Sequence, residues 1–385
     1  MSRIEEGAGL YIHFPFCSKL CHYCDFNVYA VPDIPQQDYT DAVIKELRSR
    51  GHLLGDKLIH SIFLGGGTPS LWETSQVKRV LDVVKEQFSL SNNVEISVEM
   101  NPNETSPEIL DGFRKAGCNR VSLGIQSLRD DLLKNMARRH SARQAIEALR
   151  WIKKAGFNSF SADLIFGLPG QSLDMWTEDL QQVLEMGVPH LSTYNLMVEH
   201  GTPLYLQVKR GQVSLPEDNL QVDMLTEGRK LIRQSGLSPY EISNSAIQGH
   251  ESVHNEVYWS GAAYLGVGAG SHGFLPESGG GKRQANIRKF THYMNAIDEK
   301  GTAIQEEETV DPSTHAIELM MTGLRRTDGV DIAEVAHQTL HNRDKLFRGE
   351  IEELVREGLL ERIASRLVIP EEHIPVSDSI FLRFF

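Results

Sequence analysis

Three of the four cysteines lie within eight residues of one another near the start of the chain. Cys17, Cys21 and Cys24 are separated by three and by two residues, whereas Cys118 stands alone far downstream. Three thiolates from one short loop can each bind one iron of a [4Fe–4S] cluster and leave the fourth iron open. The spacing also allows a zinc site with a fourth soft ligand, or a chance grouping of structural cysteines. We expect Cys118 to be a small buried residue rather than a ligand.

Alternating strand and helix patterns over roughly the first 235 residues must position these cysteines. Short apolar runs rich in β-branched residues alternate with longer amphipathic stretches, which is typical of βα units around a parallel sheet. We expect strands at 10–13, 61–64, 94–99, 120–124, 159–165 and 190–194, and helices at 38–48, 75–88, 107–116, 142–155, 173–184 and 220–235. Six such units favour a partial (β/α)6 barrel over a closed eight-fold barrel.

The alternation ends near residue 246, and the glycine-rich segment 261–281 predicts loops and an edge strand. From about residue 311 the pattern predicts helices at 313–323, 331–336 and 347–357, followed by strand-like runs at 360–363 and 367–369. The fold class we expect is therefore α/β: a barrel over 1–240, a barrel extension and connecting segment over 241–305, and a small helical, winged-helix-like C-terminal domain over 306–385.

Composition narrows the possible partners and the compartment. The 385 residues include 39 basic and 52 acidic side chains, a net charge of −13, which argues against broad nucleic-acid binding. No apolar run approaches the ~18–20 residues of a membrane span. The first ten residues resemble neither a secretory signal nor an Arg-rich transit peptide. We therefore expect a cytoplasmic protein with no integral membrane segment and no nucleic-acid partner.

The residues around the cysteines carry a resemblance to a known superfamily. The run Tyr11-Ile-His-Phe-Pro-Phe-Cys17, continuing through Cys21 and Cys24, resembles the signature of the radical S-adenosylmethionine (radical SAM) proteins. Its lead-in resembles one branch, the oxygen-independent coproporphyrinogen III oxidases and their relatives. The resemblance implies a partial (β/α)6 radical SAM barrel and a [4Fe–4S] cluster on the three cysteines. It also implies that SAM chelates the open iron and is cleaved to a 5′-deoxyadenosyl radical.

The same resemblance implies a SAM site at the C-terminal ends of the strands, where barrel folds place their chemistry. Gly65-Gly66-Gly67-Thr68-Pro69 resembles the family motif that pairs with the SAM amino group, and glycines also let backbone approach a ligand. An acid at position 163 is costly in an apolar strand unless it is paired or faces a polar cavity. The SAM residues implied are Tyr11, Tyr23, Gly66, Gly67, Thr68, Glu99, Gln126, Arg138, Asp163 and Met197, the last by spacing alone.

Two features depart from the oxidase pattern. Phe26 stands where the oxidase signature has a further cysteine, and the lead-in begins almost at the first residue, without the oxidase's long N-terminal extension. Both departures are shared by the haem chaperone family of the same branch, which the Cys-Asp-Phe-Asn continuation at 24–27 also resembles. They argue against decarboxylation of coproporphyrinogen III.

A downstream hexapeptide favours the haem chaperone family. His254-Asn255-Glu256-Val257-Tyr258-Trp259 resembles the HNxxYW motif that is linked there to haem binding. Imidazole is a good axial ligand for haem iron, and Tyr and Trp offer flat faces for a porphyrin. Taken alone, the hexapeptide fits a surface His beside a partly buried aromatic pair somewhat better, and the radical SAM motifs upstream reverse that balance. The haem residues implied are His254, Asn255, Tyr258 and Trp259, with His13 and His272 as the next candidates.

The resemblance as a whole implies a haem chaperone that binds haem and hands it to acceptor haemoproteins such as respiratory enzymes. A reductant such as flavodoxin or NADH would serve the cluster. Two alternatives stay open: an oxygen-independent coproporphyrinogen III dehydrogenase, and a non-catalytic iron–sulfur scaffold. No catalytic residue is assigned, and the residues leave open whether the protein is an enzyme.

Overall fold

A large mixed sheet organises the barrel. The computed structural model describes residues 6–385. Its largest sheet has twelve strands in the order β14-β13-β12-β11-β1-β4-β5-β6-β7-β8-β10-β9. The expected six strands are confirmed as a parallel run, formed by β1 (Ala8–Phe14), β4 (Ile59–Gly66), β5 (Leu90–Met100), β6 (Arg120–Gln126), β7 (Ser159–Phe166) and β8 (His190–Asn195).

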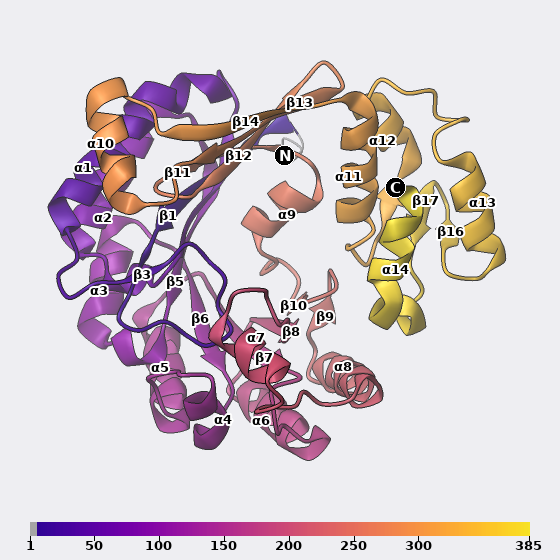
Figure 1. The fold of residues 1–385 in the computed structure, drawn as a ribbon, viewed down its shortest axis with the longest axis horizontal. Helices are drawn as coiled ribbons and strands as arrows, with labels where there is room; N and C mark the ends of the chain where they lie inside the picture. The colour runs from indigo at the N-terminus through magenta and orange to yellow at the C-terminus, as the bar shows by residue number, and fades with distance from the viewer. Residues whose placement is uncertain (1–5) are drawn as a thin grey trace.

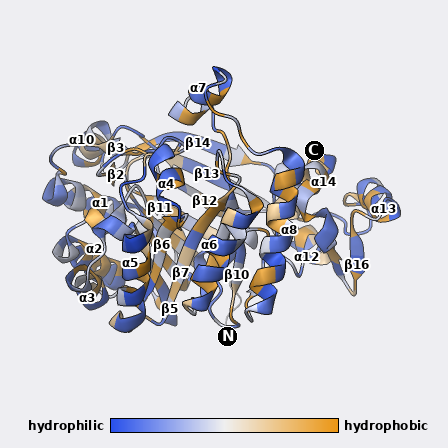
Figure 2. Cartoon of the chain, turned by 90° about the horizontal axis from the view of Figure 1, so that it is seen from below, coloured by the Kyte–Doolittle hydropathy of each residue, from blue (hydrophilic) through white to orange (hydrophobic). Residues whose placement is uncertain are grey.

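Helices cover the outer face of this parallel run (Figure 1). The six expected helices are found as α1 (Gln36–Arg50), α2 (Thr74–Gln87), α3 (Pro107–Ala116), α5 (Ala142–Ala155), α6 (Leu173–Glu185) and α8 (Asp218–Gln234). Side-chain caps fix some of their starts: Ser106 caps α3, and Ser141 with Gln144 forms a capping box at α5. Figure 2 shows hydrophobic colour along the strands and hydrophilic colour on exposed helix faces, as a barrel with its core between sheet and helices requires.

The expectation of loops and an edge strand over 261–281 is wrong. β11 (Ala263–Val267) pairs with β1 as a seventh parallel strand, and β12 (His272–Glu277), β13 (Gly280–Asn286) and β14 (Ile304–Val310) continue the sheet antiparallel. Glycine is needed here because the backbones of neighbouring strands lie close together. A Cβ at Gly266 would lie 2.0 Å from the carbonyl oxygen of His272. Strand pairing therefore overrides the local signal for loops.

Several short elements were not expected from the sequence. They are β2 (Phe16–Cys17), β3 (Tyr29–Ala30), α4 (Asp130–Asn135), α7 (Pro203–Lys209), β9 (Ser238–Pro239), β10 (Asn244–Ala246), α9 (Val253–Trp259) and α10 (Phe290–Lys300). Among these, α9 carries the HNxxYW hexapeptide and lies between the sheet and the C-terminal helices (Figure 1).

The C-terminal residues form a second hydrophobic core, built around Leu319, Met320, Leu354 and Leu367. It contains α11 (Pro312–Gly323), α12 (Ile332–Gln338), α13 (Arg348–Arg356) and α14 (Ser377–Phe381), with the small sheet β15 (Val330–Asp331), β17 (Arg366–Val368) and β16 (Glu361–Ile363). The domain limits assigned from the sequence stay predictions. Among residues 6–385, no helix combines the length and the apolar character that crossing a bilayer requires.

A buried ionic cluster fastens α1 to the extension of the sheet. The Glu46 carboxylate is fully buried and pairs with the Arg50 guanidinium. It also accepts hydrogen bonds from Tyr293 Oη (2.7 Å), Asn286 Nδ2 (2.7 Å) and the Gly268 backbone amide (2.9 Å). Each donor belongs to a different segment, so this one carboxylate ties helices α1 and α10 to strand β13 and the turn after β11.

We predict that Glu46→Ala lowers the free energy of unfolding by about 3–5 kcal/mol, because it leaves Arg50 as a buried charge without its partner. Urea unfolding followed by circular dichroism measures the change. Asp298→Ala is the control, since Asp298 pairs with Lys45 at the surface and such pairs contribute about 0–1 kcal/mol. Equal effects of the two substitutions would contradict a stabilising role for the cluster.

Candidate functional site

One cavity gathers most of the residues implied for the cofactors. Its volume is about 530 Å³, and it opens at the C-terminal ends of the parallel strands. The predicted residues that line it are Cys17, Cys21, Tyr23, Cys24, Gly66, Gly67, Thr68, Glu99, Gln126, Arg138, Asp163, Met197 and Asn255. Tyr11, His254, Tyr258 and Trp259 do not belong to this lining.

The three cysteines lie on the segment that follows β1. All three are half-buried free thiols, and Cys17 belongs to the short strand β2. Burial raises the pKa of Cys17 to about 11 and that of Cys24 to about 12. Over residues 6–385, no group of three or more His, Cys, Asp or Glu side chains is gathered so that it could hold a metal ion. Cys118 is buried away from the cavity.

A chain of polar contacts connects the cysteine segment to the glycine-rich turn. Thr68 Oγ1 donates to Cys17 Sγ (3.4 Å), and Arg138 Nη1 donates to Cys21 Sγ (3.6 Å). Asn101 joins the two: its Nδ2 donates to Thr68 Oγ1 (3.0 Å), and its Oδ1 accepts from Arg138 Nη2 (2.7 Å). Asn101 was missed by the sequence analysis, although it lies two residues after Glu99. The positions of two cysteines therefore depend on residues that follow strands β4 and β5 and on one that follows helix α4.

The glycine-rich turn needs its glycines. Gly66 has a φ of +110°, and a Cβ there would lie 2.4 Å from the His13 ring. A Cβ at Gly67 would lie 2.6 Å from the Phe16 carbonyl oxygen. The turn thus packs directly on β1 and β2, and its Gly66 amide is free to donate to Glu99 Oε2 at 3.0 Å.

Two acids face the cavity with altered acidity. Burial raises the pKa of Glu99 to about 7, with a further rise from Asp163 and an opposing effect of the Gly66 hydrogen bond. Burial also raises the pKa of Asp163, while hydroxyl donors oppose the rise. Ser122 Oγ (2.6 Å) and Ser161 Oγ (2.7 Å) donate to the two oxygens of Asp163. Perturbed acids in a cleft are typical of functional sites.

Apolar side chains surround the mouth of the cavity. Leu20, Phe26, Tyr194 and Met197 line it and are 42–66% exposed. Phe26 lies in the mouth itself, at the position where the oxidase signature has a cysteine. Apart from Met197, this group was not identified from the sequence, because residues from the cysteine segment and from the end of β8 meet only in the fold. The cavity therefore has an apolar mouth and a polar interior.

The residues of the HNxxYW motif on helix α9 lie in different surroundings. His254 is 1% exposed; its Nδ1 lies 2.8 Å from Ser61 Oγ and its Nε2 lies 2.9 Å from Tyr258 Oη. The ring stacks on Phe63 with centroids 5.0 Å apart, and burial lowers its pKa to about 3. In this arrangement both nitrogens are engaged, so His254 is not accessible as an iron ligand.

Trp259 lies at the other end of α9 and faces the C-terminal domain. Its ring is 4.8 Å from the Arg325 guanidinium, and it lines a small hollow with Leu319 and Arg326. Tyr11 lies on β1, and its Oη is hydrogen-bonded to His13 Nδ1 at 3.0 Å. Only Asn255 of the hexapeptide reaches the main cavity.

The residues present fit a polar cofactor. Among the described residues, Gln126 Oε1, Arg138 Nε and Asn244 Oδ1 are buried atoms without a hydrogen-bond partner, and all three residues line the cavity. Gln126 also has a φ of +67°, a conformation that non-glycine residues adopt mostly at functional or strained positions. A ligand with both donors and acceptors would satisfy these atoms.

Comparisons with known proteins identify the family of the chain. Residues 11–183 match the radical SAM superfamily, and residues 310–375 match the HemN C-terminal domain. The "Heme chaperone HemW" of Bacillus subtilis is 34% identical, over 97% of this chain and 98% of its own length. The bovine "Radical S-adenosyl methionine domain-containing protein 1, mitochondrial" is 35% identical, over 98% of this chain and 87% of its own length.

A solved structure shows the same fold. The coproporphyrinogen III oxidase (HemN) of Escherichia coli superposes with a TM-score of 0.84 and 22% identity, and the match covers 99% of this chain and 91% of that one. Fold and site together define a radical SAM protein with a HemN-type C-terminal domain. Within that superfamily, the chain belongs to the family of the haem chaperone HemW.

Proposed function

We propose that the protein is a haem chaperone that binds haem, passes it to acceptor haemoproteins such as respiratory enzymes, and carries a [4Fe–4S] cluster liganded by SAM. The similarity over nearly the whole chain to relatives named as heme chaperones carries this choice. Phe26 at the cavity mouth supports it over the oxidase alternative, because the extra cysteine of the oxidase signature has no counterpart there.

Cys17, Cys21 and Cys24 would hold the cluster at the mouth of the cavity. A cube of four irons offers each thiolate a different iron, so the three sulfurs need not converge on one point. When bound and reduced, such a cluster supplies the electron that cleaves SAM. Gly66 and Glu99 would receive the SAM amino group, while the unpaired atoms of Gln126 and Arg138 offer it further hydrogen bonds. Tyr11, Tyr23, Gly67, Thr68, Asp163 and Met197 complete the proposed SAM residues.

The partners and the compartment remain predictions. A reductant such as flavodoxin or NADH would serve the cluster, and the cytoplasm is the expected compartment because thiolate ligands need a reducing environment. Of the haem residues, His254 becomes available only if α9 leaves the sheet, whereas Asn255 already faces the cavity. The non-catalytic scaffold is the alternative in which neither SAM nor haem binds specifically.

Haem transfer tests the function directly. The anaerobically reconstituted protein, loaded with haem, should convert an apo-haemoprotein to its active holo-form faster than free haem at the same concentration does. The same sample, given SAM, a reductant and coproporphyrinogen III, should form no protoporphyrinogen IX. Product formation would favour the dehydrogenase, and absence of specific haem and SAM binding would favour the scaffold.

The cluster can be tested by iron and sulfide analysis. We expect about four irons and four sulfides per chain after anaerobic reconstitution, because three thiolates with an open iron match the cubane form. Replacing Cys17, Cys21 or Cys24 with Ala should abolish the visible absorption. Cys118→Ala is the matched control and should retain it, since Cys118 lies outside the cavity. Equal loss in all four variants would refute the ligand assignment.

SAM binding should depend on pH through Glu99. Because burial raises the pKa of Glu99 to about 7, the carboxylate is charged above that pH and neutral below it. The charged form accepts hydrogen bonds from the SAM amino group more strongly than the neutral form does, so we expect affinity to fall as the pH drops from about 8 to about 6, by up to roughly tenfold. Calorimetric titration of the reconstituted protein measures this change. Glu99→Gln should bind weakly at both pH values, and a pH profile like that of the unmodified protein would contradict the role of Glu99.

A further inference from the structure

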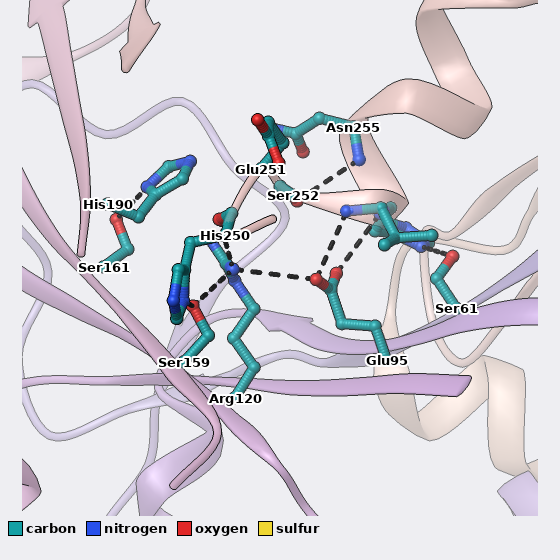
Figure 3. Close-up of polar contacts among 12 residues, drawn as sticks. Ser61, Glu95, Arg120, Ser159, Ser161, His190, His250, Glu251, Ser252 and Asn255 are labelled. Carbon is teal, nitrogen blue, oxygen red and sulfur yellow. Dashed lines mark hydrogen bonds and ion pairs between the residues drawn. The ribbon is translucent and has the colours of Figure 1, made fainter. Parts of the chain in front are cut away.

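We propose that the floor of the main cavity, at the opposite end from the cysteine segment, is a carboxylate-binding subsite formed by Arg120, Asn255 and Ser252. Its ligand would be a propionate arm of haem. The inference rests on the proposed haem-binding function and adds the place and the group by which haem would be recognised. The floor residues and their polar contacts are drawn in Figure 3.

The inner faces of the strands leave room for a ligand to reach this floor. In closed barrels the interior is filled by Val, Ile and Leu. Here three of the strand residues that line the cavity carry small hydroxyl side chains instead, and Phe63 and Ile165 are apolar exceptions. The three are Ser122 on β6, Ser161 on β7 and Ser192 on β8. Arg120 lies four residues before Gly124 on β6, so the lumen extends about 13 Å below Gly124.

Arg120 is a cation held in place with part of its guanidinium uncommitted. It is 4% exposed and lines the cavity. Its Nη1 donates to Ser159 Oγ and to the His250 carbonyl oxygen, both at 2.9 Å. The nearest acid, Glu95, is 3.7 Å from Nη1. Within the described residues, Nη1 makes every hydrogen bond of this guanidinium, which leaves Nη2 for a ligand in the cavity.

Glu95 does not compete for Arg120, because the first turn of α9 occupies its oxygens. The backbone amides of Val253 and His254 donate to Glu95 Oε2 and Oε1, each at 3.2 Å (Figure 3). Glu95 thus supplies a counter-charge that lets Arg120 stay buried. Glu95 does not occupy the planar donor edge of the Arg120 guanidinium. That edge, which suits a carboxylate, is therefore available to another partner.

Asn255 and Ser252 provide neutral hydrogen-bonding groups beside this cation. The Asn255 backbone amide donates to Ser252 Oγ at 3.3 Å, while the Asn255 side chain lines the cavity without a hydrogen bond to another described residue. Ser252 is 4% exposed and keeps its hydroxyl hydrogen available. Nearby, the buried Asn244 Oδ1 also lacks a partner, but as an acceptor it needs a donor and so lies outside the proposed carboxylate subsite.

Asp163, which lies nearer the strand ends than Arg120, does not prevent a ligand carboxylate from binding at the floor. Burial raises the pKa of Asp163 and so favours its neutral form, while the serine hydroxyls that donate to both of its oxygens, and Arg120, oppose the rise. The cavity therefore combines an apolar mouth, formed by Leu20, Phe26 and Met197, with a cationic, hydrogen-bonding floor. Haem has a flat apolar body with two carboxylate arms on one edge, and this division of polarity matches it.

Titration with haem and with haem dimethyl ester, in which the propionates are blocked, tests the subsite. We expect the unmodified protein to bind haem at least about tenfold more tightly than the ester, as for one hydrogen bond to a charged group. Asn255→Ala should remove most of that preference by weakening haem alone. Asn92→Ala, an exposed asparagine on β5 outside the cavity, is the control and should bind both ligands normally.

Arg120→Lys provides a second variant that keeps a charge beside Glu95 but loses the planar fork. Its circular dichroism shows whether it folds, and it too should lose the preference for haem. Equal binding of haem and ester by the unmodified protein would overturn the subsite and leave the proposed function standing. Binding of neither would overturn both. If Asn255→Ala weakens SAM rather than haem, the carboxylate belongs to SAM and the haem assignment is wrong.

Discussion

The predominantly polar inner face of the described parallel strands is the constraint on which the rest of this structure depends. Inward positions of the parallel strands carry serines, acids, Arg120 and His190, and leaving such groups unsatisfied in a protected space costs free energy. Most of them therefore bond to one another in layers, although Ser97 Oγ has no partner. His190 Nδ1 lies 2.9 Å from Ser161 Oγ, and Ser161 Oγ donates to Asp163 at 2.7 Å. The remaining space is the cavity.

That constraint also explains why α9 lies where it does. The lower end of a polar lumen needs a cover that offers hydrogen bonds, and the first turn of a helix offers free amides. Glu95 accepts hydrogen bonds from two of these amides, and Ser61 Oγ is hydrogen-bonded to His254 Nδ1. The outer side of the same short helix contacts the C-terminal domain, where Glu256 pairs with Arg326 at 3.3 Å. The short helix α9 thus covers the lower end of the lumen and contacts the second core.

The parallel strands, the helices between them and the cysteine site could be predicted because their signals are local. Alternating patterns place β4 or α5 without knowledge of any neighbour, and the spacing of Cys17, Cys21 and Cys24 lies within one loop. The strands after residue 261 could not be predicted in this way. Their glycines signal turns, and only pairing with β1 shows that Gly266 serves close backbone contact. Asn101 was missed for the same reason, since its partners Thr68 and Arg138 come from two distant segments.

The HNxxYW hexapeptide shows most clearly how a motif can be recognised without its geometry being known. The residue types alone suggest that the imidazole of His254 and the rings of Tyr258 and Trp259 contact the same ligand. In a helix, however, successive residues point in different directions, so a run of six must face several environments. His254 and Tyr258, four residues apart, share the face that packs against β1 and β4, and they bond to each other. Trp259 turns toward Arg325. Asn255 is left as the member that faces the lumen, and a neutral amide there recognises a carboxylate more readily than it binds iron.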